Sequence, residues 1–319
     1  LSPAFSSSTT SYTCTVENSV TSTTISATST SSVASITGTG EKSLKVGSNT
    51  FTISVTSQSG SVKTYQVVVT RKASSDATLK SITVSNGTLS PTFSVSTTSY
   101  TVSVPYSISN VTVGATVNNS EASVTGTGAK ELVVGTNTVT LTVTSGDKTK
   151  KTYTVNITRE KDTDNTLKSL SIKGCSLTPT FDSNTTSYTC TVENSVKVAE
   201  ISLEANSSVA TLKYENQNLN VGENTVNIVV TAQNGVAKTY QVVVTRKASS
   251  DATLNNLEVE GKTLTPEFNK DTLRYNLSVP YDVSKINIVG SSSETTSSIE
   301  GLGIKELVVG ENSFDIKVT

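Results

Sequence analysis

The chain has 319 residues, a formal net charge of −1 and a charged fraction of 16%, and these values exclude several classes of protein. There is no basic excess of the kind that binds nucleic acid, and no run of 18 apolar residues that would predict a membrane span. Histidine, methionine and tryptophan are absent, whereas serine, threonine and valine are abundant. The apolar residues alternate with polar ones, so the composition indicates β-strands and not a disordered segment.

Three phrases recur along the chain at intervals of 87 or 88 residues. The phrase L-[ST]-P-x-F-x-x-x-T-[TL]-x-Y begins at Leu1, Leu89, Leu177 and Leu264. The phrase L-x-V-G-x-N begins at Leu44, Leu132, Leu219 and Leu307, and K-T-Y-x-V-x-[VI]-T-R ends at Arg71, Arg159 and Arg246. The spacing predicts four repeats, which we name repeat 1 to repeat 4, at residues 1–72, 73–160, 161–247 and 248–319.

Repeat 2 illustrates the local structure that the sequence predicts. Its apolar residues occupy every second position in short runs, and no run has the period of 3.6 that a helix requires. The predicted strands are, in chain order, 79–85, 99–104, 110–115, 122–126, 131–134, 137–145 and 151–158. About seven strands in fewer than 90 residues predict an immunoglobulin-like sandwich of two sheets.

The phrase L-x-V-G-x-N places a glycine between two predicted strands, with an asparagine two residues later. The glycines are Gly47, Gly135, Gly222 and Gly310. Because glycine and asparagine tolerate a positive φ, the pattern predicts a tight hairpin in each repeat.

The phrases LSPTFSVSTTSYTVSVP, VTGTG, LVVGTNTVTLTV and KTYTVNITR of repeat 2 resemble the cadherin-like β-sandwich repeat of bacterial surface and secreted proteins. The resemblance extends over the whole chain, four times. It implies an all-β tandem array of four immunoglobulin-like sandwiches of about 87–88 residues, displayed outside the cell as a stalk or as a presenter of other domains. Short linkers predict an elongated rod. The resemblance implies no particular ligand.

Two classes of function are compatible with such an array. The first is a non-enzymatic structural spacer of an extracellular surface protein or fibre, whose partners are the neighbouring repeats. The second is an adhesin-type module for a glycan or a protein, which needs an exposed aromatic or arginine-rich patch. Tyr106 and Tyr281 follow the proline of VPY in repeats 2 and 4 only, so they are candidate contact residues; packing at the edge of the core is the other interpretation. Tyr214 also lacks an equivalent elsewhere.

The sequence predicts no enzyme and no cofactor. Without histidine there is no Ser-His-Asp or Cys-His arrangement, and the S-x-x-K match at 145–148 lies in a predicted turn. Calcium between repeats would need six to eight oxygen ligands. The one weak Ca²⁺ candidate is the linker EKDTDN, with Glu160, Asp162, Asp164 and Asn165, which we interpret first as solvated charge.

Two of the three cysteines occupy one copy of the first phrase. Cys175 and Cys190 stand where repeat 2 has Gly87 and Val102. If the first strand of the repeat passes beside the SYT strand, the two sulfurs meet, so we predict a disulfide. A stable disulfide indicates an oxidising compartment and hence an extracellular location. Two buried free thiols are the alternative.

Cys14 matches Cys190, and its partner would lie two residues before Leu1. Repeat 1 lacks the counterpart of residues 76–88, and repeat 4 lacks that of residues 151–158. We therefore expect a segment of a longer array, with Cys14 paired upstream. The alternative is a filament subunit whose missing strands come from a neighbouring copy of the chain.

Overall fold

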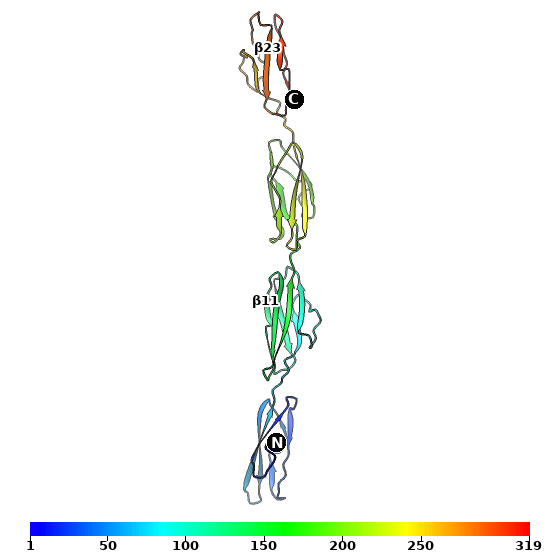
Figure 1. The fold of residues 1–319 in the computed structure, drawn as a ribbon, viewed down its shortest axis with the longest axis vertical. Helices are drawn as coiled ribbons and strands as arrows, with labels where there is room; N and C mark the ends of the chain where they lie inside the picture. Colours follow the sequence, from blue (N-terminus) through cyan, green and yellow to red (C-terminus); the bar gives the residue numbers. More distant parts are fainter. The chain divides into compact units, whose positions relative to one another are not determined.

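The computed structural model describes residues 1–319, which form β-strands, turns and loops without any helix. The chain divides into two units, residues 1–163 and 164–319. Each β-sheet is built from the strands of a single repeat (Figure 1). No helix exists that is long and apolar enough to cross a membrane.

Repeat 2 has seven strands, as predicted, but the strand predicted at 131–134 lies earlier, at Gly128–Glu131, because residues 132–134 form the corner between the two sheets. The seven strands are β7 (Leu79–Val84), β8 (Ser99–Val104), β9 (Asn110–Val117), β10 (Ser123–Thr125), β11 (Gly128–Glu131), β12 (Gly135–Thr144) and β13 (Lys150–Arg159). One sheet has the order β10-β12-β13-β8 and the other the order β11-β9-β7. The two sheets make the predicted sandwich, and β11 is labelled in Figure 1.

The core of repeat 2 lies between its two sheets. Every second residue is buried from Val139 to Val143 in β12 and from Tyr153 to Ile157 in β13, because successive side chains of a strand point to opposite faces of the sheet. The fully buried members of these two strands are Leu141, Val143, Tyr153, Val155 and Ile157. Burying each such side chain stabilises the fold by roughly 1.5–3 kcal/mol. This gain offsets the conformational entropy that the chain loses when it folds.

Repeat 1 has the same arrangement with one strand fewer. Its strands are β1 (Ser11–Val16), β2 (Ser22–Ile25), β3 (Ser35–Thr37), β4 (Gly40–Ser43), β5 (Gly47–Thr56) and β6 (Val62–Arg71), in sheets β1-β6-β5-β3 and β2-β4. No counterpart of β7 lies in residues 1–72, and the buried core is correspondingly smaller, with Tyr12, Leu44, Ile53, Val67 and Val69.

Repeat 3 differs from repeat 2 in one sheet. Its strands are β14 (Leu167–Ile172), β15 (Ser187–Val192), β16 (Val198–Ala199), β17 (Ile201–Ala205), β18 (Thr211–Lys213), β19 (Gln217–Asn218), β20 (Gly222–Thr231) and β21 (Ala237–Arg246). The sheet β15-β21-β20-β18 matches that of repeat 2. The counterpart of β9 is broken at Glu200 into β16 and β17, which pair with β19 and β14 respectively.

Repeat 4 keeps one complete sheet, β22-β23-β25, the counterpart of β7-β9-β11. Its strands are β22 (Leu254–Val259), β23 (Lys285–Ser292), β24 (Ile299–Glu300), β25 (Gly303–Glu306) and β26 (Lys317–Val318). The counterpart of β8 forms only an isolated bridge between Thr265 and Asn276. In repeat 2, β8 pairs with β13 alone, and no residue of the described chain occupies the positions equivalent to β13.

The structure corrects the hairpin prediction for the L-x-V-G-x-N phrase. Gly135 has φ +96°, as a tight turn requires, but the strands on either side of it belong to different sheets. The phrase therefore carries the chain from one sheet of the sandwich to the other. Asn137 supports this crossing, because its side chain donates to the carbonyls of Val133, Gly135 and Ile157. The asparagine two residues after the glycine thus stabilises a crossing between sheets. The local sequence pattern alone does not distinguish such a crossing from a hairpin turn.

Candidate functional site

In repeats 1 to 3 the strand after the L-[ST]-P-x-F phrase lies parallel to the last strand of the repeat. The pairs are β1–β6, β8–β13 and β15–β21, each with six residue pairs in register. In repeat 2 the ladder begins with Thr154 N donating to Thr98 O at 2.8 Å and ends with Glu160 N donating to Val104 O at 2.9 Å. We call this pair the terminal ladder, because it joins an early segment of each repeat to the segment where the chain leaves it.

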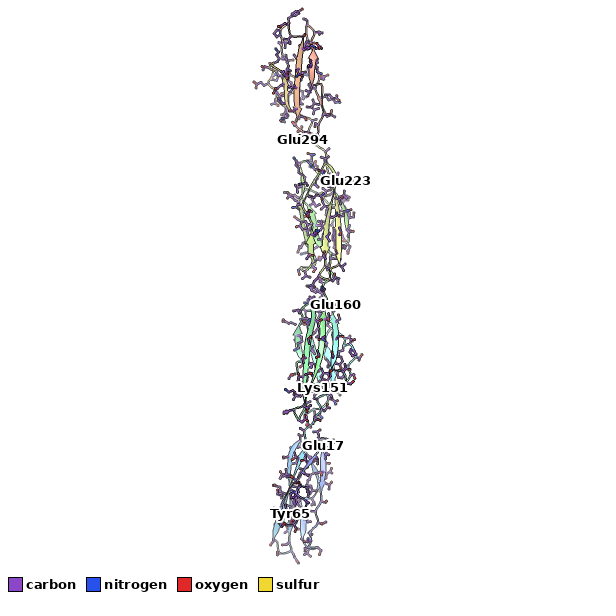
Figure 2. The ribbon with its side chains drawn as sticks, in the orientation of Figure 1. Glu17, Tyr65, Lys151, Glu160, Glu223 and Glu294 are labelled. Atoms are coloured by element: carbon purple, nitrogen blue, oxygen red, sulfur yellow. A yellow bond between two sulfur atoms is a disulfide. The ribbon has the colours of Figure 1, made fainter.

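An arginine fixes the end of each terminal ladder. In repeat 2, Arg159 donates from Nε and Nη2 to the carbonyl of Tyr106, at 2.9 and 2.6 Å, and from Nη1 to the carbonyl of Leu132 at 3.1 Å. The planar guanidinium holds two loops at once, which a lysine ammonium does not do with the same geometry. Arg71 and Arg246 make the equivalent bonds in repeats 1 and 3. Glu160, which is labelled in Figure 2, follows the arginine. Its carboxylate accepts a bond from Ser103 Oγ at 2.7 Å.

The tyrosine of the first phrase fixes the other end of the ladder. Tyr100 is buried, and its hydroxyl lies 2.8 Å from the carbonyl oxygen of Ser94 and 2.9 Å from that of Thr97. Tyr12 and Tyr188 make both equivalent contacts in repeats 1 and 3, and Tyr275 makes the first of them, to Asn269 O, in repeat 4. These tyrosines are framework residues, because a buried phenol needs a hydrogen-bond partner and each of them finds it inside its own repeat.

The two candidate contact tyrosines occupy different environments. Tyr106 is half-buried, and the Arg159 guanidinium lies 4.7 Å from its ring centroid. Repeats 1 and 3 have Asn18 and Asn194 at this position, and both amides donate to the carbonyl of the residue after the arginine, at 3.0 Å. Tyr281 is 89% exposed and makes no hydrogen bond or ring contact. Tyr106 thus packs on its own repeat, whereas Tyr281 is free to meet a partner.

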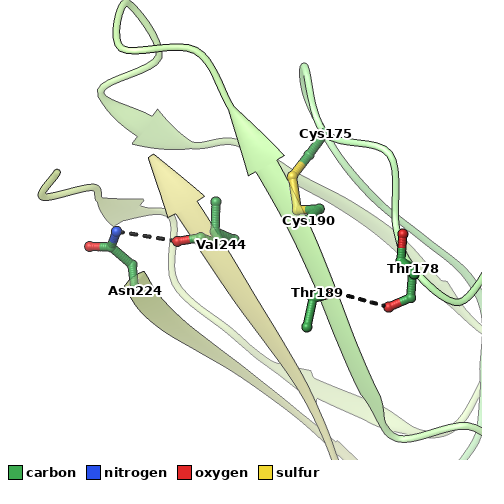
Figure 3. The surroundings of a disulfide bond; sticks show 6 residues. All are labelled: Cys175, Thr178, Thr189, Cys190, Asn224 and Val244. Atoms are coloured by element: carbon green, nitrogen blue, oxygen red, sulfur yellow. Dashed lines mark hydrogen bonds between the residues drawn. A yellow bond between two sulfur atoms is a disulfide. The ribbon is translucent and has the colours of Figure 1, made fainter. Parts of the chain in front are cut away.

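A disulfide joins Cys175 to Cys190, with the two Cα atoms 5.6 Å apart (Figure 3). Cys190 lies in β15, and the neighbouring Thr189 N donates to Thr178 O at 2.8 Å, so the first phrase runs beside β15. In repeat 2 the same space is filled differently: a Cβ on Gly87 would overlap the Val102 side chain. Cysteine at both positions therefore replaces a glycine–valine contact by a covalent bond.

Cys14, the third cysteine, is free and half-buried in β1. It lies opposite Val69 in the terminal ladder of repeat 1. Its pairing with a cysteine upstream of Leu1 stays a prediction.

The four calcium candidates do not form a metal-binding group. Nowhere in the chain do three or more Asp, Glu, His or Cys side chains gather around a position that could hold a metal ion. Glu160 is bonded to Ser103, and Asp164 Oδ1 accepts bonds from Thr166 N and Oγ1, at 2.9 and 2.5 Å. Asn165 donates weakly to Val236 O at 3.4 Å.

Aspartate–threonine turns precede the first strand of repeats 2, 3 and 4. In repeat 2, Asp76 Oδ1 accepts bonds from Thr78 N at 2.9 Å and Thr78 Oγ1 at 2.6 Å, and Oδ2 accepts one from Asn118 at 2.8 Å. These bonds favour the ionised carboxylate, and the threonine hydroxyl is the largest cause, so the pKa of Asp76 is lowered. The pKa of Asp251 is lowered for the same reason.

Within the first unit, Glu121 connects the body of repeat 2 to its own first residues and to Asn18 of repeat 1. Its carboxylate accepts bonds from Ser74 N and from Asn18 Nδ2, both at 2.9 Å. The bond from Asn18 is the largest cause that lowers the pKa of Glu121. Repeats 3 and 4 have Val209 and Thr296 at this position, so the connection is specific to repeat 2.

One surface feature was not predicted as a site. In repeat 3 a groove of about 510 Å³ lies beside β20, lined by Tyr214 and by polar residues that include Asn216, Gln217 and Asn227. The signal in the sequence is that repeat 3 has Tyr214 where repeat 2 has Gly126, and is one residue shorter just after it. A second, smaller hollow of about 300 Å³ lies in repeat 4, beside Phe268.

A family profile described as a cadherin-like beta sandwich domain matches three successive parts of the chain. The matched residues are 1–72, 79–160 and 167–247. Residues 248–319 lie outside the match, although β22, β23 and β25 repeat the sheet of β7, β9 and β11. No curated protein sequence matches the chain.

Solved cadherin structures are similar to the chain at low identity. The protocadherin GammaB4 extracellular domain is 10% identical, with 93% of this chain and 57% of that chain covered and a TM-score of 0.28. Mouse cadherin-23 EC22-24 is 11% identical, with 75% and 96% covered and a TM-score of 0.27. Drosophila N-cadherin EC1-3 is 9% identical, with 74% and 98% covered and a TM-score of 0.31. The chain thus spans 57% of the protocadherin GammaB4 structure. The sandwich topology and the profile match over most of its length establish that the chain belongs to the family of cadherin-like β-sandwich domains.

Proposed function

We propose that the chain is a non-enzymatic spacer of an extracellular surface protein or fibre, and that its repeats carry tension while they hold other domains away from the cell. The observation that carries the proposal is the terminal ladder. In repeat 2, β8 and β13 are parallel, so a pull on the two ends of the ladder acts along the strands in opposite directions. All its hydrogen bonds then resist together, whereas strands pulled apart from one end lose their bonds one at a time.

The residues around the ladder support the same role. Arg159 and Tyr100 fix its two ends, and the equivalent residues recur in the other complete ladders. Arginine and tyrosine are among the residue types most often found at binding hot spots, but here these side chains make their hydrogen bonds within their own repeat. The partners of a spacer repeat are its neighbours, and the bond that Glu121 accepts from Asn18 of repeat 1 is one such connection.

Two observations support an extracellular location. Cadherin-like repeats are typically extracellular adhesion or structural modules. The disulfide between Cys175 and Cys190 suits an oxidising compartment, because cytosolic thiols are kept reduced.

The experiment compares two substitutions of Glu160 by single-molecule force spectroscopy on the full chain with its disulfide intact. Glu160→Pro removes the N–H that donates to Val104 O, the last bond of the ladder, whereas Glu160→Ala removes only the side-chain contact with Ser103. We expect the proline variant to lower the unfolding force of repeat 2 and its free energy of unfolding by about 1 kcal/mol. The unfolding event of repeat 2 is distinguished from that of repeat 3 by its length, because the disulfide of repeat 3 shortens the extension that its unfolding releases. Equal unfolding forces for the two variants would contradict the proposal.

An adhesin-type function is the second candidate, and one observation favours it. Tyr214 lines a groove at a position where repeats 1, 2 and 4 have a glycine in close contact with the neighbouring strand, so the shared framework does not account for it.

A further inference from the structure

The groove of repeat 3 lies between the segment that follows β18 and the outer face of β20. Thr225, Asn227 and Val229 alternate with buried residues along β20 and so face outward. Tyr214 and Gln217 line the opposite side. The groove is therefore an open furrow at the edge of a sheet, with Thr225, Asn227 and Val229 on its floor and Tyr214 on its wall.

Repeats 1, 2 and 4 have a glycine at the position of Tyr214, and there the chain lies directly against the neighbouring strand, so that no groove forms between them. In repeat 2 the chain at Gly126 passes so close to β12 that a Cβ would overlap the carbonyl oxygen of Thr140. Gly38 and Gly301 meet the strand in the same way in repeats 1 and 4. Tyr214 takes the place of Gly126, as the pairing of Thr125 with Thr142 and of Lys213 with Val229 establishes. Because tyrosine has a Cβ, the segment cannot lie against Asn227, the counterpart of Thr140.

The segment is nevertheless held in a defined position. Asn216 Oδ1 accepts a bond from Ile201 N at 3.1 Å, just after the break between β16 and β17. Gln217 and Asn218 pair with Ala199 and Val198. The break at Glu200, the missing residue and the tyrosine thus belong to one local rearrangement, whose result is a groove with two fixed sides.

Three side chains of the groove, Tyr214, Glu215 and Gln217, have no side-chain partner within the protein. Asn216 accepts the bond from Ile201 N, and Asn227 Oδ1 accepts a weak bond from Gln241 Nε2 at 3.4 Å. Tyr214 is 40% exposed, and its hydroxyl makes no hydrogen bond, in contrast with the framework tyrosines. The Glu215 carboxylate forms no ion pair, and the Gln217 amide makes no side-chain hydrogen bond. An exposed aromatic face beside free amide and carboxylate groups offers stacking together with both donors and acceptors.

We propose that this groove binds a neutral oligosaccharide. A sugar ring presents C–H groups that pack on an aromatic face and hydroxyl groups that pair with amides and carboxylates. Lys213 and Glu215 carry opposite charges, so the groove favours neither an anionic nor a cationic ligand. This function goes beyond the spacer role and does not depend on the terminal ladder.

The test uses the full chain and an array of neutral oligosaccharides built from glucose, mannose, galactose and N-acetylglucosamine. Hits are measured again in solution by NMR titration. We expect binding to at least one of them, weakened at least about tenfold by Tyr214→Ala, since a stacking aromatic residue dominates such a contact. Leu273→Ala is the control, because Leu273 is an exposed apolar side chain of the same unit that does not line the groove, and it should leave the affinity unchanged.

A second variant separates loss of the ring from loss of the groove. Tyr214→Phe keeps the stacking face and should retain more affinity than Tyr214→Ala. Absence of binding to every oligosaccharide, or equal weakening by Leu273→Ala, would overturn the proposal. Neither result would alter the unfolding force of repeat 2, so this proposal and the spacer proposal fail independently.

Discussion

Cys190 lies opposite Val244 in the terminal ladder of repeat 3, and its sulfur is bonded to Cys175, just after β14. The disulfide therefore ties the first strand of the repeat directly to the ladder. Tension that detaches β14 reaches β15 through the sulfur atoms, and the segment between the two cysteines cannot extend. Repeat 2 has no such bond, so the two repeats form a natural comparison within one chain.

The disulfide should transfer to repeat 2. Gly87 has no left-handed φ, and the Val102 side chain occupies the space that a second sulfur would fill. We expect Gly87→Cys with Val102→Cys to form a disulfide and to stabilise repeat 2 by about 3 kcal/mol, the chain-entropy value for a loop of this length. Mass spectrometry of the alkylated protein and denaturant unfolding with and without reductant measure both effects. The single variant Val102→Cys is the control, and two free thiols in the double variant would refute the prediction.

Replacing Arg159 by lysine should destabilise repeat 2. Lysine cannot reproduce the fork that reaches the carbonyls of Tyr106 and Leu132, so we expect a loss of about 1–3 kcal/mol in the free energy of unfolding. Tyr106→Asn, which copies the residue at this position in repeat 1, should change stability by less than about 1 kcal/mol. Hydrogen exchange of the β13 amides locates both effects. A larger loss in Tyr106→Asn than in Arg159→Lys would show that ring stacking, and not the carbonyl bonds, holds the end of the ladder.

Two neighbouring glycines give a matched test of the close approach to β12. Gly126 and Gly128 have similar positive φ values, +94° and +99°, so alanine is strained in both. Only at Gly126 would the new Cβ overlap a backbone atom, the Thr140 carbonyl oxygen. Gly126→Ala should therefore destabilise repeat 2 more than Gly128→Ala does, by at least about 1 kcal/mol in denaturant unfolding. Equal losses would mean that φ alone requires glycine here.

Acidification should remove the contribution of Asp76. Its pKa is lowered in the folded state, so its stabilisation is present above the unfolded pKa of about 3.9 and is lost as the pH falls through the folded pKa. Asp76→Asn should therefore lower the stability of repeat 2 at neutral pH and make progressively less difference as the pH falls below that unfolded pKa. Thermal unfolding of both proteins across this range measures the difference. A difference that does not change with pH would contradict the role of the ionised carboxylate.

Much of the fold follows from local periodicity. The alternation of Val139, Leu141 and Val143 predicts a strand and its buried face, because each side chain of a strand faces opposite to the next. The position of Cys190 against Cys175 follows from comparing repeats, since two substitutions that occur together indicate contact. The parallel direction of β8 and β13 is not readable in this way, because it depends on where the chain crosses between sheets.

The groove and the corner at Gly135 show where sequence reasoning ends. Gly135 with Asn137 predicts a tight turn, but whether the next strand joins the same sheet depends on pairing far along the chain. Tyr214 has no equivalent in the other repeats, but the structural effect of this tyrosine depends on how closely Gly126 approaches Thr140. The distance between two segments that are remote in sequence cannot be predicted from the residues of either segment alone.

The most direct test of the spacer account compares two directions of pulling on repeat 2 within the full chain. In the first, force is applied through residues 76 and 162, so that β8 and β13 slide past each other. In the second, it is applied through residues 97 and 149, at the same end of both strands, so that the ladder opens one bond at a time. The account predicts a clearly higher unfolding force in the first direction. Equal forces, or a lower force in the first direction, would contradict the claim that the terminal ladder carries load.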